Sequence, residues 1–102
     1  MEDELLPASH FLDEVKDNIE VYTSIDDKKI LHNISGAIAL LKEAGVRLPS
    51  KNDLNTHGLD LYTTTLSFIV LQQINHETYF PLFESRLKMN VNSLRFGSFK
   101  DG

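Results

Sequence analysis

The hydrophobic positions of this chain recur mostly at helical spacing. The clearest case is the stretch from Ser24 to Gly45, where apolar residues return every three or four positions and cover an arc of roughly 140° on a helix. Ser24 is expected to cap the first turn, and Asp26 and Asp27 suit the positive end of the helix dipole. Gly45 can adopt the left-handed backbone conformation that commonly ends a helix. We therefore predict a long helix near residues 25–44. Its apolar face consists of Ile30, Leu31, Ile34, Ala37, Ile38, Leu41 and Ala44.

A shorter amphipathic segment precedes the long helix, and a more apolar one follows it. Ser9 is expected to cap a helix near residues 10–22. The segment near residues 56–75 contains good strand-forming residues, but its length favours a helix. It is apolar on several sides, so it must be covered on several sides, either by its own chain or by a neighbouring copy.

The last helix is predicted near residues 79–96, with Pro81 tolerated in its first turn and Gly97 at its end. Its core row consists of Tyr79, Phe80, Phe83, Leu87, Val91 and Leu94. A second apolar row, Leu82, Met89 and Phe96, has a spacing of seven residues and faces another way. This second row could pack on the loop of its own chain or on another molecule, and the pattern leaves both open.

The predicted fold class is therefore all-α: residues 1–102 form a single helical domain, a small bundle of about four helices with a long central helix. Residues 1–8 are expected to form a loose N-terminal leader, and residues 98–102 a flexible tail. Residues 46–55 form the one long loop, which is either a slack connector or a partner-binding loop.

Composition narrows the class of protein. Hydrophobic residues make up 41% of the chain and charged residues 25%, as in ordinary globular proteins. There is no cysteine, and no apolar run approaches the roughly 20 residues that span a membrane. The acidic N-terminus differs from the basic start of a secretory signal. We expect an intracellular protein without membrane contact.

The net charge of −5 is unevenly distributed. Residues 1–27 contain nine Asp and Glu side chains and one Lys, whereas residues 84–102 contain four Lys and Arg side chains and two acids. An acidic chain without a basic stripe is poorly suited to binding nucleic acid. One acidic and one basic end would allow copies to stack head-to-tail, although such charge runs are often only solvated faces.

No chemical activity can be read from the sequence. The four histidines, His10, His32, His57 and His76, never show the spacing of a zinc-binding helix, and the glycines form no phosphate-binding loop. No serine lies in a nucleophile motif. A DNA-binding helix-turn-helix would need cations on its second helix, and residues 56–75 contain no Lys or Arg. We predict no catalytic residue, no metal site and no cofactor.

Four segments together resemble a known family. The chain contains FLDEVKDNI, then the acidic turn SIDDKKI, the small-residue helix ISGAIALLKEAGV and the ending VNSLRFG. This order, over roughly residues 11–97, is similar to the small head-to-tail connector proteins of tailed bacteriophages, the DNA-packaging or head-completion family. The family typically shows an LDEVK-like segment, an acid-rich turn, a helix rich in alanine and a closing Leu-Arg element.

The resemblance implies a structural protein of virion assembly. It implies an all-helical protomer that forms a homo-oligomeric ring with the symmetry of the portal, between the portal protein and the tail or the next connector. Such a protein would act in the host cytoplasm during assembly and in the virion neck afterwards, without chemistry and without sequence-specific DNA binding. The sequence alone leaves open a dimeric regulatory or adaptor protein, and an enzyme subunit whose site lies at an interface.

The expected contact between copies lies on the last helix. We predict that its second apolar row packs on the next copy, with cations of the same helix near that copy's acidic first helix. The predicted interface residues are Leu82, Arg86, Lys88, Met89, Arg95 and Phe96.

Overall fold

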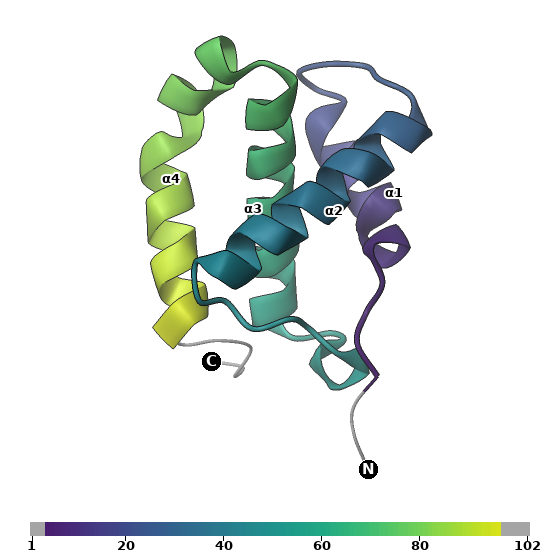
Figure 1. The fold of residues 1–102 in the computed structure, drawn as a ribbon, viewed down its shortest axis with the longest axis vertical. Helices are drawn as coiled ribbons and strands as arrows, with labels where there is room; N and C mark the ends of the chain where they lie inside the picture. Colours follow the sequence, from purple (N-terminus) through teal and green to yellow (C-terminus); the bar gives the residue numbers. More distant parts are fainter. Residues whose placement is uncertain (1–3, 97–102) are drawn as a thin grey trace.

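A computed structural model describes residues 4–96, which form four α-helices and two short 3-10 helices without a β-strand (Figure 1). In chain order the elements are η1 (Ala8–Phe11), α1 (Leu12–Ile19), α2 (Asp27–Glu43), η2 (Lys51–Asp53), α3 (His57–Ile74) and α4 (His76–Phe96). The predicted all-α class and the bundle of four helices are confirmed. None of the helices within residues 4–96 is long and apolar enough to cross a membrane.

Helix α3 is the centre of the bundle. It contacts α1, α2 and α4, and Figure 1 shows α1 and α4 on opposite sides of it while α2 crosses over it. Ten of its residues are buried, on several sides of the helix. The sequence left open whether its own chain or a second copy covers α3. Its own chain covers it, so the apolar character of α3 by itself gives no reason to expect an oligomer.

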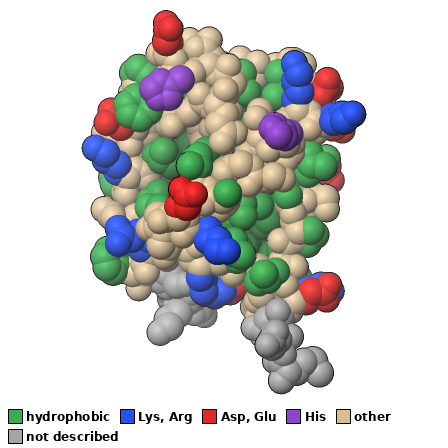
Figure 2. Space-filling view, in the orientation of Figure 1, with side chains coloured by type: hydrophobic (Ala, Val, Ile, Leu, Met, Phe, Trp, Pro, Cys, Tyr) green, Lys and Arg blue, Asp and Glu red, His purple; other side chains and the backbone are tan. Residues whose placement is uncertain are grey.

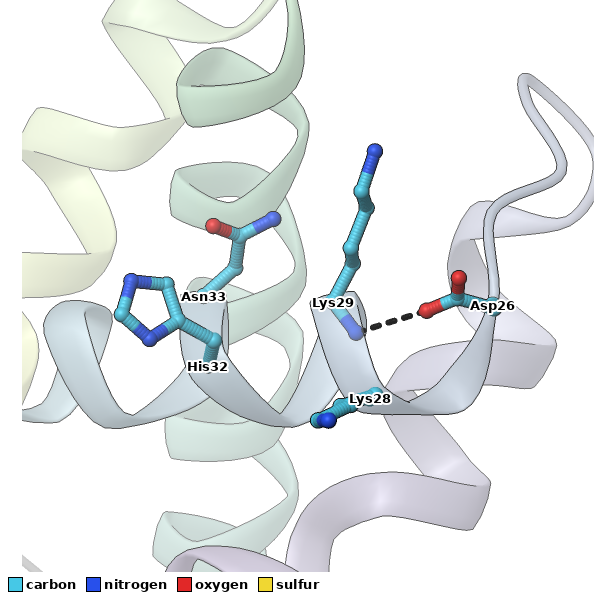
Figure 3. Close-up of a pocket in the computed structure, with 5 residues that line it drawn as sticks. All are labelled: Asp26, Lys28, Lys29, His32 and Asn33. Atoms are coloured by element: carbon cyan, nitrogen blue, oxygen red, sulfur yellow. Dashed lines mark hydrogen bonds between the residues drawn. The ribbon is translucent and has the colours of Figure 1, made fainter.

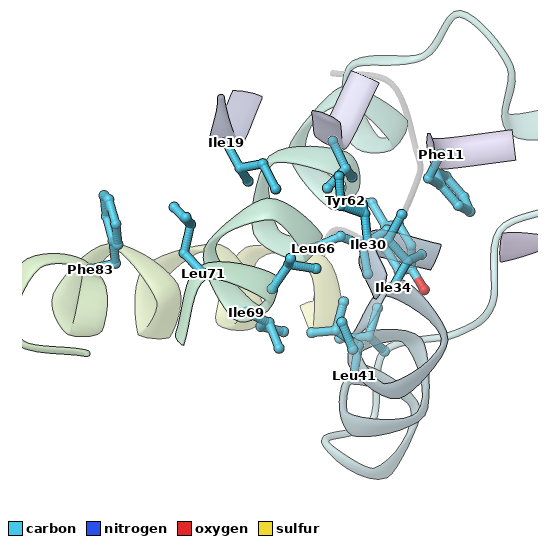
Figure 4. Packing of buried hydrophobic residues seen from close by; sticks show 14 of the residues in the cluster. Phe11, Ile19, Ile30, Ile34, Leu41, Tyr62, Leu66, Ile69, Leu71 and Phe83 are labelled. Atoms are coloured by element: carbon cyan, nitrogen blue, oxygen red, sulfur yellow. The ribbon is translucent and has the colours of Figure 1, made fainter. Parts of the chain in front are cut away.

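The core runs through all the helices, as Figure 4 shows. Phe11 and Ile19 come from the N-terminal elements, Ile34 from α2, Leu66 from α3 and Phe83 from α4, and each is at most 5% exposed. Burial of each such side chain stabilises the fold by about 1.5–3 kcal/mol. The predicted apolar face of α2 therefore packs as expected in its central part.

The start of α2 differs from the prediction. The helix begins at Asp27, and its cap is Asp26, whose carboxylate accepts a hydrogen bond from the backbone N–H of Lys29 at 2.9 Å. Ser24, the predicted cap, lies two residues outside the cap position. An Asp at the cap also places a negative charge at the helix start. Asp26 therefore provides both the capping side chain and the charge that favours the helix dipole. Gly45, with φ of +96°, ends the segment as predicted.

The first helix is shorter than predicted. A 3-10 turn over Ala8–Phe11 precedes α1, which ends at Ile19 rather than near residue 22. Ser9 is not its cap: it lies inside the 3-10 turn, whose cap position is Pro7, without a side-chain hydrogen bond. The backbone carbonyl of Pro7 accepts a hydrogen bond from the His10 N–H at 2.9 Å, so the turn closes without a capping side chain.

Helix α4 begins earlier than predicted, at His76. The side-chain oxygen of Asn75 accepts a hydrogen bond from the backbone N–H of Thr78 at 3.2 Å, which is a capping interaction. Pro81 therefore lies in the second turn, not the first, and cannot donate the hydrogen bond that the Glu77 carbonyl would receive in a regular helix. Gly97 and the predicted tail over residues 98–102 lie outside the described residues.

The N-terminal leader was predicted to be loose, which is wrong for residues 4–8. Leu5 and Ser50 form an isolated antiparallel bridge, the Leu6 N–H donates to the Pro49 carbonyl at 3.0 Å, and the Lys51 N–H donates to the Glu4 carbonyl at 2.9 Å. These long-range hydrogen bonds fasten the leader to the 46–55 loop, which a reading of local composition does not detect.

The 46–55 loop is also ordered, so the slack connector is wrong. Ser50 and Asp53 form a reciprocal capping box around η2. Arg47 makes two hydrogen bonds to the Asp53 carboxylate, at 2.7 and 3.1 Å, and the Asp53 side chain is only 7% exposed. A carboxylate buried to this extent must be paired, and the cation and the capping box pair it. The S-x-x-D spacing at residues 50–53 was the signal in the sequence for this turn.

Candidate protein-binding surface

The second apolar row of α4 is exposed. Leu82, Met89 and Phe96 are 61%, 68% and 81% exposed, whereas Phe83 and Leu94 of the same helix are buried. Residues seven positions apart lie two turns apart on nearly the same side of a helix, so the three side chains form one line along α4. The row does not pack on the loop of its own chain. We call it the α4 row.

The predicted cations of α4 are not gathered along this row. Arg86 lines a hollow with Asn18 and Tyr22, so it faces back toward the α1 segment. Lys88 forms an ion pair with Glu84 of its own helix, at 3.6 Å. These two cations are therefore engaged with, or directed at, their own protomer.

Arg95 lies at the far end of α4, next to the end of α2. Its Nε is 3.3 Å from the position that a Cβ at Gly45 would occupy, and its guanidinium carbon is 5.4 Å from the centre of the Phe96 ring. A cation at this place suits the negative end of the α2 dipole. Of the three predicted cations, Arg95 is the one that adjoins a residue of the α4 row.

Acidic side chains lie at the other side of the bundle, on α1. Asp13, Glu14 and Asp17 are exposed, and α1 and α4 lie on opposite sides of α3 (Figure 1). The Nζ of Lys16 forms an ion pair with the Asp27 carboxylate at 2.9 Å. The hydrogen bond to that carboxylate and its negative charge raise the pKa of Lys16. The exposed acids of α1 therefore lie on the opposite flank of α3 from α4, which carries Glu77 and Glu84 as well as its cations.

A shallow apolar hollow of about 240 Å³ lies near the N-terminal segment. Its walls come from three parts of the chain, with Leu5, Leu6 and Phe11 on one side, Ser35 and Ile38 of α2 on another, and Pro49 of the loop. In Figure 2 hydrophobic side chains gather on this face beside the N-terminal segment, below α2. We call it the Leu5 hollow. Sequence analysis missed it because the leader was predicted to be loose, although the adjacent leucines at 5 and 6 were a signal.

Another hollow, of about 520 Å³, lies along the first turns of α2 (Figure 3). Asp26, Lys28, Lys29, His32 and Asn33 line it, and the Asp26 carboxylate is the helix cap. The two lysines and the histidine lie along one helix, with no polar group of another helix among these lining residues to fix a ligand. The hollow thus holds no arrangement of nucleophile, base and oxyanion donors.

The histidines lie apart from one another. His10 contacts the Phe11 ring edge-on at 5.1 Å, and His76 stacks on Phe80 at 4.7 Å. Within residues 4–96 no three His, Asp or Glu side chains come together as a metal site would require. The features with an apolar character that the described residues offer to another molecule include the α4 row and the Leu5 hollow.

Comparison with known proteins adds no relative: no family model, no curated protein and no solved structure matches this chain.

Proposed function

We propose that this protein is a non-catalytic assembly protein whose copies associate head-to-tail through the α4 row. The observation that carries the proposal is the exposure of Leu82, Met89 and Phe96 in a helix whose other apolar side chains are buried or half-buried. Three large apolar side chains exposed along one side of one helix are a candidate for a protein contact. Water covers this patch in the monomer, and a second molecule would cover it in an assembly.

The contact is proposed to be between unlike surfaces. The α4 row lies on one flank of α3, and the acidic helix α1 lies on the other. In the proposed contact, the α4 row of one copy therefore meets a different surface on the next copy. A contact of this kind closes into a ring when the rotation per copy divides the circle. Apolar burial supplies most of the affinity, and the charges set register and the rate of encounter.

In its specific form, the proposal is a ring-forming head-to-tail connector of a tailed bacteriophage. The ring would sit between the portal protein and the tail or the next connector, act in DNA packaging and head completion, and occupy the virion neck after assembly in the host cytoplasm. This form rests on the resemblance of residues 11–97 to that family. The net charge of −5 supports it, because a channel that bound DNA tightly would hinder its passage.

The first test measures assembly. Sedimentation of the wild-type protein, alone and with a portal ring, should show a closed species of many copies. Met89→Asp should abolish it while circular dichroism stays unchanged, because the carboxylate is exposed in the monomer and buried without a partner only in the assembly. Gln73→Asp, which adds the same charge at an exposed position of α3 outside the row, is the matched control and should still assemble.

Two results would contradict the proposal. A wild-type protein that stays monomeric with and without a portal ring has no assembly function of this kind. A closed dimer that does not grow with concentration favours instead the small dimeric regulatory or adaptor protein, since a twofold contact uses the same patch on both copies.

A further inference from the structure

The Leu5 hollow has the size and chemistry to accept one large apolar side chain. Its volume is about 240 Å³, and an apolar cavity of about 150 Å³ already takes a benzene molecule. Among the residues that line it, only Ser35 has a polar side chain, and the Ser35 hydroxyl already donates to the Leu31 carbonyl at 3.2 Å. A ligand in this hollow would therefore meet apolar walls and no charged group.

The walls of the hollow are held in place before anything binds. The backbone hydrogen bond from Leu6 to Pro49 and the bridge between Leu5 and Ser50 fix the leader against the loop. Phe11 is 1% exposed and forms part of the core. Because the site is already formed, little conformational entropy is lost when a side chain enters it.

The α4 row supplies side chains of the matching kind. Met89, in the middle of the row, is 68% exposed on the outside of α4, and an unbranched thioether adapts well to an irregular apolar hollow. The row and the hollow have no residue in common. One copy can therefore use its row while its hollow stays free for another copy.

The charges around the two surfaces are complementary. On the acceptor side, Glu4 of the leader is paired with Lys51 at 2.9 Å, and the exposed acids are those of α1 next to the leader, Asp13, Glu14 and Asp17. Along the α4 row, Lys88 is paired with Glu84 and Arg86 faces its own α1 segment, so Arg95 is the cation that lies beside the row. Opposite charges on the two surfaces steer one copy onto the next and oppose a contact of either surface with itself.

We infer that the Leu5 hollow is the acceptor for α4 of the next copy, with Met89 as the side chain that enters it. This inference rests on the proposed head-to-tail assembly and names the surface that completes it. The occupant is a second copy of this chain. In the assembly, the α4 row of each copy would contact the hollow of one neighbour, and its hollow would accept the α4 row of the other neighbour.

Cross-linking tests the pairing directly, because the natural chain has no cysteine. Met89→Cys and Ser35→Cys are made as separate proteins, mixed, and treated with a short thiol-to-thiol reagent. The expected product is a dimer that joins residue 89 of one variant to residue 35 of the other, whereas each variant alone should stay uncross-linked. Met89→Cys mixed with Val21→Cys, which lies at an exposed position outside the hollow, is the matched control and should give little product.

A blocking variant tests the same contact by affinity. Ser35→Arg places a long, charged side chain over the hollow from an exposed position of α2, and should weaken association by about tenfold or more. Ala39→Arg, with the same change one turn along α2 and outside the hollow, should leave association unchanged. Mixed in equal amounts, Ser35→Arg and Met89→Asp should form a dimer and stop there, because one functional row then meets one open hollow.

The outcomes separate this inference from the proposed function. If wild type assembles, Met89→Asp does not, and Ser35→Arg assembles like wild type, the α4 row is an interface but the hollow is not its acceptor. Efficient cross-linking of Met89→Cys with itself would likewise overturn the inference, since it places row against row. A wild type that never associates contradicts both proposals.

Discussion

At the scale of single residues, two carboxylates fix where helical turns begin. Asp26 accepts the backbone N–H of Lys29 at the start of α2, and Asp53 accepts the backbone N–H of Ser50 at 2.7 Å in the turn of η2. The first is exposed, and the second is buried and paired with Arg47. The Asp53 carboxylate therefore has a charged partner in the folded chain.

The cap of α2 can be tested by substitution. Asp26→Ala should lower the free energy of unfolding by about 1 kcal/mol, because the Lys29 amide loses its partner and the helix dipole loses a negative charge. Ser24→Ala, two residues away, should change it by less than about 0.5 kcal/mol. Urea denaturation of both variants measures the difference, and equal losses would show that Asp26 is not the dominant cap.

Asp53 predicts an acid-dependent loss of stability. Burial by itself raises the pKa of Asp53, but hydrogen bonds from Arg47 and Ser50 outweigh burial, and the pKa lies below its ordinary value. The unfolded chain therefore binds this proton first as pH falls. The contribution is complete above the ordinary pKa of about 3.9 and is lost as pH falls through the lower folded value.

Asp53→Asn should remove this dependence. Its free energy of unfolding should be lower than that of wild type at neutral pH, and should fall less between about pH 5 and pH 3. Urea denaturation over a pH series gives both slopes, with Asp17→Asn, at an exposed position of α1, as the control. Parallel curves for wild type and Asp53→Asn would contradict the prediction.

At the scale of elements, the helices differ in how much of their surface the bundle uses. Helix α3 is buried on several sides, α2 is buried on one side through Ile34 and Leu41, and α4 is buried on one side and keeps an exposed apolar row. A helix with one buried face is what a two-layer packing requires. The second apolar row of α4 has no such role in the monomer.

Two neighbouring leucines of α2 differ in burial, so they allow the effect of core packing to be compared with that of an exposed apolar side chain. Leu41 is 2% exposed and Leu40 is 49% exposed. Leu41→Ala should lower the free energy of unfolding by about 2–5 kcal/mol, since it removes a buried side chain and leaves a cavity. Leu40→Ala should cost less than about 1 kcal/mol. Thermal and urea unfolding of both variants provide the measurement, and similar losses would mean that α2 packs by another face.

At the scale of the whole molecule, the separation of charge and the position of the α4 row act together. Arg95 is next to Phe96 of the row, and the exposed acids Asp13 and Glu14 lie on the opposite flank of α3 with α1. A charge at the edge of an interface affects association mainly through encounter and register, whereas an apolar side chain in its centre determines how long the contact lasts.

Salt should therefore distinguish two variants of α4. Arg95→Glu should weaken assembly less than Met89→Asp does, and its effect should shrink as the salt concentration rises, because mobile ions screen exposed charges. The loss caused by Met89→Asp should stay nearly constant over the same range. Sedimentation at several salt concentrations measures both, and an Arg95→Glu defect that does not respond to salt would contradict a steering role.

The sequence by itself determined the helical class, the four segments and the presence on the last helix of a second apolar row that faces away from its core row. These follow from periodicity, which is local: side chains three, four or seven positions apart share a side of a helix wherever that helix packs. The same local rule identified the buried face of α2 around Ile34 and Leu41. The exact starts of α2 and α4 were misplaced because several capping residues stand close together, and only backbone geometry selects among them.

Tertiary structure alone decided what depends on distant parts of the chain. It fastened Leu5 and Leu6 to the 46–55 loop, formed the hollow between them and α2, and covered α3 by three helices of its own chain. It also directed Arg86 and Lys88 to their own protomer and left the α4 row uncovered. Periodicity says which side of a helix is apolar, but what covers that side is set by elements far away in sequence, whose positions follow from the packing of the whole core.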